Sequence, residues 1–160
     1  MSLTSWLYRR CRRIADRRDP DYVIGGSAQP YLLRWWVIPR NRVFNIYLHL
    51  FLRSDDDRAL HDHPWVNMSW LLSGAYREHT IAPGGIHLRR EFRAGDVKLR
   101  RPRAAHRVEL HAGPCWSLFV TGPVVRAWGF HCPEQGWVPW QRFTKSGEGK
   151  TGEIGAGCEG

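Results

Sequence analysis

The chain has 160 residues, which is the size of one ordinary domain and long enough to bury a core of its own. Apolar residues make up 42% of it and nine residues are Trp, so the composition excludes a chain that is disordered throughout. The formal net charge of +9 comes mostly from arginine and is compatible with an anionic small ligand, nucleic acid, a phospholipid surface or a solvated basic surface.

The first segment, residues 1–26, is predicted to be a short basic helix followed by a loop. Over residues 5–18, apolar side chains are spaced among six arginines in the pattern of an amphipathic helix. Such a helix lies on an anionic surface or, more commonly, packs against a core with its arginines in water. Asp19-Pro20 and Gly25-Gly26 end the helix and open the loop.

The middle of the chain, residues 27–144, is predicted to consist of short antiparallel strands in a sandwich or barrel. The pair 66–72 and 75–81 is expected to form a hairpin joined at Ser73-Gly74. The glycine-rich tail, residues 145–160, is expected to be disordered. Strands are expected over residues 31–38, 43–52, 66–72, 75–81, 87–92, 96–100, 106–110, 116–121 and 126–131.

Three histidines stand out in this β-rich region. His61 and His63 are two positions apart, so a strand that carries them points both imidazoles to one face. His106 follows forty-three positions after His63. Neutral imidazole binds iron, zinc, copper or nickel, and three imidazoles leave coordination positions open for water, oxygen or substrate.

The spacing around these histidines resembles the two sequence motifs of the cupin superfamily, whose members are RmlC-like β-barrels. The first motif is matched by His61, His63 and Gly74, and the second by Gly95 and His106 with the family's separation. The proline usual within the second motif is shifted to Pro102. The chain also resembles small cupin-like proteins of bacteria and their phages.

The resemblance implies an all-β fold, an antiparallel double-stranded β-helix of the jelly-roll type, with one divalent metal ion inside. The family's glutamate ligand would stand seven positions before Gly74, where this chain has Asn67, a weaker and uncharged ligand. A three-histidine site similar to that of cysteine-dioxygenase-type cupins is the closer match. Fe(II) is the favoured metal, with Zn, Ni or Mn as alternatives, and the net charge of such a centre favours a small anionic substrate.

Further side chains are candidates for the pocket around the metal. His49 shares a strand face with Asn45 and Tyr47 that is expected to line the pocket, although a hydrogen-bonded core histidine is the more common case. Trp65 is a candidate wall residue. Arg77 and Arg126 are candidates for binding a substrate carboxylate in a bidentate manner. Asp62 is expected to face the opposite way and to pair with an arginine.

The four cysteines form no CxxC pair, so reduced thiols are expected. A rival zinc site from His111, Cys115, His131 and Cys132 has suitable ligand types, but its spacing matches no familiar zinc finger. The chain has no secretory apolar stretch and no run of about eighteen apolar residues, which predicts a cytoplasmic protein without a membrane span.

The leading functional hypothesis is an Fe(II)-dependent oxygenase that acts on a small anionic molecule held beside His61, His63 and His106. Two alternatives stay open: a metal-independent sugar epimerase or isomerase that uses a His–Asp pair, and a non-catalytic ligand-binding module. The densely basic stretch from Arg89 to Arg107 has Phe92 as its only aromatic residue, so nucleic acid is not the favoured partner. A homodimer formed through an edge strand is a possible assembly.

Overall fold

The computed structural model describes residues 2–55, 59–146 and 151–158. Strands dominate, and they follow a single N-terminal helix of 13 residues. The elements are α1 (Leu3–Ala15), β1 (Tyr22–Ile24), β2 (Leu32–Trp36), β3 (Asn45–Phe51), β4 (Leu60–His61), β5 (Asn67–Ser73), β6 (Ala75–Ala82), β7 (Ile86–Arg93), β8 (Val97–Arg100), β9 (Arg107–Glu109), β10 (Cys115–Thr121), β11 (Gly129–Cys132), β12 (Gly136–Pro139), α2 (Trp140–Phe143), β13 (Thr144–Ser146) and β14 (Thr151–Ile154).

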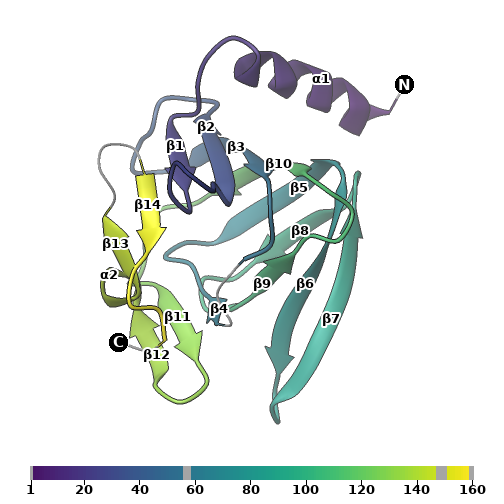
Figure 1. Cartoon of the computed structure of the whole chain (residues 1–160). Coiled ribbons are helices and arrows are strands. Elements are labelled where there is room, and N and C mark those ends of the chain that lie inside the picture. Colours follow the sequence, from purple (N-terminus) through teal and green to yellow (C-terminus); the bar gives the residue numbers. More distant parts are fainter. Residues whose placement is uncertain (1, 56–58, 147–150, 159–160) are drawn as a thin grey trace.

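The strands form one large sheet and two small ones. The large sheet has the order β13-β14-β1-β2-β3-β10-β5-β8, and the small sheets have the orders β12-β11-β4 and β7-β6-β9. The described strand pairs are antiparallel except for β1 with β14, which is parallel. In Figure 1 the β6–β7 ribbon runs along the side of the molecule away from β1 and β2. The predicted antiparallel β-barrel fold is confirmed.

Strand β3 shows why neither face of the large sheet is polar. Tyr47 and His49 are buried on the side of the barrel interior, where the cavity lies. Leu48 points the other way and packs with Trp35 and Trp116 in a cluster that includes residues of α1. Because one face meets the interior and the other meets a helix, both sets of alternating side chains are largely apolar.

Helix α1 covers the outer face of the large sheet. The hydroxyl of Ser2 accepts a hydrogen bond from the backbone N–H of Ser5, which caps the start of the helix. Leu7, Cys11 and Ile14 pack on the cluster around Trp35, while the arginines of the helix are exposed. The helix therefore packs against the core, which is the second of the two predicted alternatives. None of the described helices is long and apolar enough to cross a membrane.

The predicted hairpin over residues 66–81 is wrong. Strand β5 pairs with β10 and β8, whereas β6 pairs with β7 and β9, so the chain passes from one sheet to the other at Gly74. Gly74 has φ +84°, and a Cβ there would lie 2.8 Å from the carbonyl oxygen of Pro114. A turn signal between two apolar strands does not encode which neighbours the strands choose.

The predicted disorder of residues 145–160 and the predicted reduced state of all four cysteines also need correction. Strand β14 pairs with β1 and with β13, and a disulfide joins Cys132 to Cys158. Cys11 and Cys115 are buried free thiols. The parts of the predicted tail over residues 147–150 and 159–160 lie outside the described residues. At the other end, β1 joins the large sheet from within the segment predicted to be helix and loop.

Candidate metal centre

Backbone pairing brings the three histidines together. His61 ends β4, and it forms an antiparallel bridge with His106: each backbone N–H donates to the other's carbonyl, at 2.9 and 3.0 Å. The N–H of His63 donates to the carbonyl of Pro102 at 3.0 Å. The segment of His61 and His63 is thus held against the segment before β9, as the spacing of the two motifs implied.

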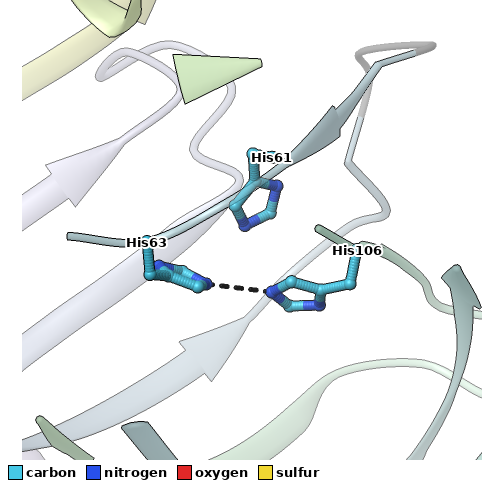
Figure 2. A group of neighbouring side chains, drawn as sticks. All are labelled: His61, His63 and His106. Carbon is cyan, nitrogen blue, oxygen red and sulfur yellow. Dashed lines mark hydrogen bonds between the residues drawn. The ribbon is translucent and has the colours of Figure 1, made fainter. Parts of the chain in front are cut away.

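The three imidazole rings point toward one another (Figure 2). One ring nitrogen of each residue lies within 4.8 Å of the nitrogens of the other two. The Nε2 atoms of His63 and His106 are 3.0 Å apart and form a hydrogen bond in which one ring donates. Three converging nitrogen ligands are a donor set that iron, zinc, nickel or copper accepts, so the cluster could bind a metal ion.

Burial keeps these imidazoles in the neutral form that binds metal. Loss of solvent lowers the pKa of His61, and it lowers the pKa values of His63 and His106 well below the ordinary range. The positive charge of Arg100 lowers all three further. For His61 the nearby carboxylate of Asp55, 3.9 Å from Nδ1, partly opposes this effect on the pKa.

Glu78 is the carboxylate that stands behind the cluster. It is buried on β6, and one of its oxygens lies 2.8 Å from Nδ1 of His106 and 3.1 Å from Nζ of Lys98. The same oxygen contacts the guanidinium of Arg100, whose pKa burial lowers to about 10. The contact with His106 lacks the angles of a hydrogen bond and is electrostatic. A negative charge beside Nδ1 favours the proton there, which leaves the Nε2 lone pair of His106 facing the centre of the cluster.

Asp62 faces away from the cluster, as strand alternation predicted. It links the segment after β4 to strands β11 and β12 by hydrogen bonds. The residue is only 1% exposed, and its carboxylate accepts hydrogen bonds from the backbone N–H of Gly129 and from Nε1 of Trp137. It also pairs with Arg126 at 2.9 Å and with His131 at 3.1 Å. Asp62 therefore stabilises the backbone that carries His61 and His63.

The two arginines predicted to bind substrate do not line the cavity. Arg126 is held by Asp62. Arg77 lies on the outer side of β6, where its Nε atom is 2.7 Å from Glu91 and its Nη1 atom is 3.7 Å from Glu109. Its neighbours in sequence, Tyr76 and Glu78, are the buried ones. Register decides which arginines face inward, and the sequence does not reveal register.

A cavity of about 600 Å³ adjoins the histidine cluster and includes the predicted pocket residues His49 and Trp65. Trp65 stacks beside His63, with ring centroids 6.5 Å apart. Aromatic side chains form much of the wall. Among described residues the charged lining consists of five cations and one carboxylate: Arg34, Arg40, Arg53, Arg100, Lys145 and Asp55.

Arg34 is one of the pocket residues that sequence reasoning missed. It lies on β2 directly opposite His49 on β3, and its Nε atom donates a hydrogen bond to Nε2 of His49 at 2.9 Å. His49 also stacks on Phe119, with ring centroids 5.0 Å apart, and Phe119 lies 5.9 Å from the ring of His63. One signal could have found Arg34: it is the only charged residue in the apolar run from Tyr31 to Ile38.

Two further ligand predictions find no support in the geometry. Asn67 is buried at 1% exposure on β5, but it does not line the cavity, and its side-chain oxygen and nitrogen have no hydrogen-bond partner among described residues. The rival zinc site is excluded because Cys132 is in a disulfide. Its histidines are also engaged elsewhere, His111 with Glu91 and His131 with Asp62.

No protein-family model matches the sequence, and no curated protein matches it. Among solved structures, the chain is similar to the iron(II) form of HppE, with a TM-score of 0.51, 13% identity, and coverage of 66% of this chain and 56% of that one. A conserved protein with a double-stranded β-helix domain from Klebsiella pneumoniae gives a TM-score of 0.50 and 19% identity, with coverage of 71% and 96%. The DMSP lyase DddQ from Ruegeria pomeroyi gives a TM-score of 0.50 and 16% identity, with coverage of 68% and 56%. The chain thus spans little more than half the length of HppE and DddQ. These likenesses show the fold, which is a double-stranded β-helix.

Proposed function

We propose that the chain is a metal-dependent enzyme, an Fe(II)-dependent oxygenase that acts on a small anionic molecule at His61, His63 and His106. The observation that carries the proposal is the convergence of three neutral imidazole nitrogens within 4.8 Å of one another. The similar fold of HppE, which was solved with iron(II), supports the choice of metal. Iron(II) held by these histidines would supply oxygen activation, since imidazole ligands alone leave positions open for O₂ and substrate.

The side chains of the cavity support an anionic substrate. Among the described residues its charged lining is cationic apart from Asp55, so an anion is attracted into the cavity. The aromatic side chains of Trp65 and Phe119 give the space beside His63 apolar walls. Glu78 orients His106, and Asp62 holds the backbone of the other two histidines, so the ligands are fixed before a metal arrives.

The test is oxygen consumption by protein reloaded anaerobically with Fe(II) and then exposed to a panel of small carboxylates and phosphate esters. We expect uptake that depends on one class of compound, and no uptake by zinc-loaded protein or by His106→Ala, because zinc has no redox chemistry. A loaded protein that consumes no oxygen with any compound contradicts the oxygenase proposal.

One observation favours a second function, that of a metal-independent epimerase or isomerase. Asp55 and His61 both line the cavity, and the carboxylate lies 3.9 Å from Nδ1 of the imidazole, where its charge raises the proton affinity of a candidate base. Turnover of a sugar substrate that persists after exhaustive chelation would favour this function over the oxygenase.

A further inference from the structure

Arg34 is a charged group in the cavity without a matching charge. Its guanidinium donates to His49 through Nε, and its Cζ atom lies 4.9 Å from the ring centroid of Tyr47. Within the described part of the chain, no carboxylate stands at ion-pair distance from it. Lys98 and Arg100, by contrast, share the carboxylate of Glu78. Arg34 is half-buried, and a partly desolvated cation without an anion costs stability that an anionic ligand would restore.

His49 fixes the direction in which this cation points. Burial and the charge of Arg34 lower the pKa of His49 well below its ordinary range, so the ring is neutral and accepts through Nε2. The ring itself packs against Tyr47 and Phe119, with ring centroids 6.0 and 5.0 Å away. His49 is therefore a positioning residue for Arg34 rather than a ligand at the metal.

Because Nε donates to His49, the two terminal Nη groups of Arg34 are the ones that remain for a ligand. No hydrogen bond joins them to another described residue, and neither Nη atom is fully buried. Arg34 belongs to the cavity wall. Two parallel N–H groups on a planar, permanently charged fork match the two oxygens of a carboxylate or phosphate.

We infer that Arg34, held by His49, forms an oxyanion-binding subsite of the cavity that is separate from the histidine cluster and takes the carboxylate or phosphate group of the substrate. The ring of Phe119 contacts both His49 and His63, with centroids 5.0 and 5.9 Å away, so the subsite adjoins the histidine cluster without sharing a side chain with it. The inference rests on the proposed function only for calling the ligand a substrate. Binding of the anion itself needs no metal and no turnover.

The test is calorimetric titration of chelator-treated, metal-free protein with benzoate and, separately, with phenyl phosphate. The two probes carry the same ring and distinguish a carboxylate from a phosphate as the preferred group. The variants are Arg34→Gln, which removes the charge, and Arg34→Lys, which keeps the charge but not the fork. Arg89→Gln on the exposed strand β7 is the matched control, because it changes the net charge equally without touching the cavity.

We expect at least one probe to bind the metal-free wild type and Arg89→Gln equally well. Arg34→Gln should weaken that affinity about 10- to 100-fold, the range for hydrogen bonds to a charged group, and Arg34→Lys should fall between them. Equal affinity in Arg34→Gln and wild type overturns the inference. So does failure of both probes to bind metal-free wild type, or binding that appears only after Fe(II) or Zn(II) is added and disappears in His63→Ala.

A second variant tests the role of His49. His49→Phe keeps an aromatic ring packed against Tyr47 and Phe119 but removes the acceptor for Nε of Arg34. If His49 positions the guanidinium, the preferred probe binds several-fold more weakly, while circular dichroism and thermal unfolding show a folded domain. If His49 serves packing alone, His49→Phe binds the probe as the wild type does, which contradicts the positioning role.

Discussion

The carboxylate of Glu78 lies 2.8 Å from Nδ1 of His106, on the opposite side of the imidazole from the Nε2 atom that faces His63. Glu78→Gln should therefore weaken metal binding about 10- to 100-fold, the usual effect of losing a carboxylate behind a ligand histidine. It also leaves Lys98 and Arg100 buried without their anion, so the free energy of unfolding should fall by about 3–5 kcal/mol. Metal titration and urea unfolding measure the two effects.

Glu91→Gln is the control for that change. Glu91 is an exposed carboxylate that pairs with Arg77 and His111 on the outer side of the barrel. Its loss should change stability by no more than about 1 kcal/mol and leave metal affinity unaltered. If Glu78→Gln behaves like Glu91→Gln, Glu78 does not support the candidate metal centre.

Asn67→Leu tests whether the amide at the position of the family's glutamate is a ligand. The side-chain oxygen and nitrogen of Asn67 are buried without hydrogen-bond partners among described residues, and the residue lies outside the cavity wall. Replacing it by an apolar side chain of similar shape should keep the metal content and leave stability equal or higher, because an unsatisfied amide is removed. Loss of metal from Asn67→Leu in folded protein would restore Asn67 as a ligand.

The metal-free protein should lose stability below about pH 6.5, the ordinary pKa of histidine in an unfolded chain. Burial lowers the pKa values of His49, His61, His63 and His106, so between pH 6.5 and their folded values only the unfolded chain takes up these protons. The free energy of unfolding then falls with falling pH, by up to about 1.4 kcal/mol per pH unit for each histidine.

Urea unfolding of chelator-treated protein at several pH values between 5 and 7.5 measures this slope. In His49→Phe one of these histidines is absent, so the slope should be shallower by the contribution of about one proton. A free energy of unfolding that stays constant as the pH falls from 6.5 would mean that the four imidazoles are not held neutral by burial.

The disulfide between Cys132 and Cys158 joins the segment after β14 to strand β11. Trp140, Phe143 and Lys145, which lie between the two cysteines in sequence, line the cavity. Reduction, or Cys158→Ser, should lower the free energy of unfolding by about 2–4 kcal/mol, the typical contribution of a loop-closing disulfide. Thiol titration under denaturing conditions should find two free cysteines, Cys11 and Cys115. Four free thiols in protein purified without reductant would exclude the bond.

Much of the fold could be predicted from the sequence because the signals are local. Alternation of apolar side chains located most strands, and the period of two placed His61 and His63 on one face. The partners of each strand could not be predicted in this way. Strands β5 and β6 are adjacent in sequence yet lie in different sheets, and nothing in their composition distinguishes a hairpin from a passage between sheets.

The residues of the candidate site likewise fall into those that a local sequence signal identifies and those that depend on strand register. Its three histidines could be found because the period of two places His61 and His63 on one face and the resemblance to the two cupin motifs adds His106. Arg34 and Glu78 are part of the site only through register: Arg34 faces His49 across two strands, and Glu78 reaches His106 from β6. Arg77 precedes Glu78 by one position and points to the opposite side of the same strand. A register error of one residue would therefore place Arg77, instead of Glu78, beside the histidine cluster.

The most direct test of the central claim is elemental analysis of protein purified without a metal-affinity tag, with wild type beside His63→Ala and His106→Ala. We predict close to one equivalent of iron, or of a metal that replaces it, in the wild type and its loss from both variants while circular dichroism shows that they remain folded. Wild-type protein that carries no metal and takes up neither added Fe(II) nor Zn(II) would contradict the claim that His61, His63 and His106 form a metal centre.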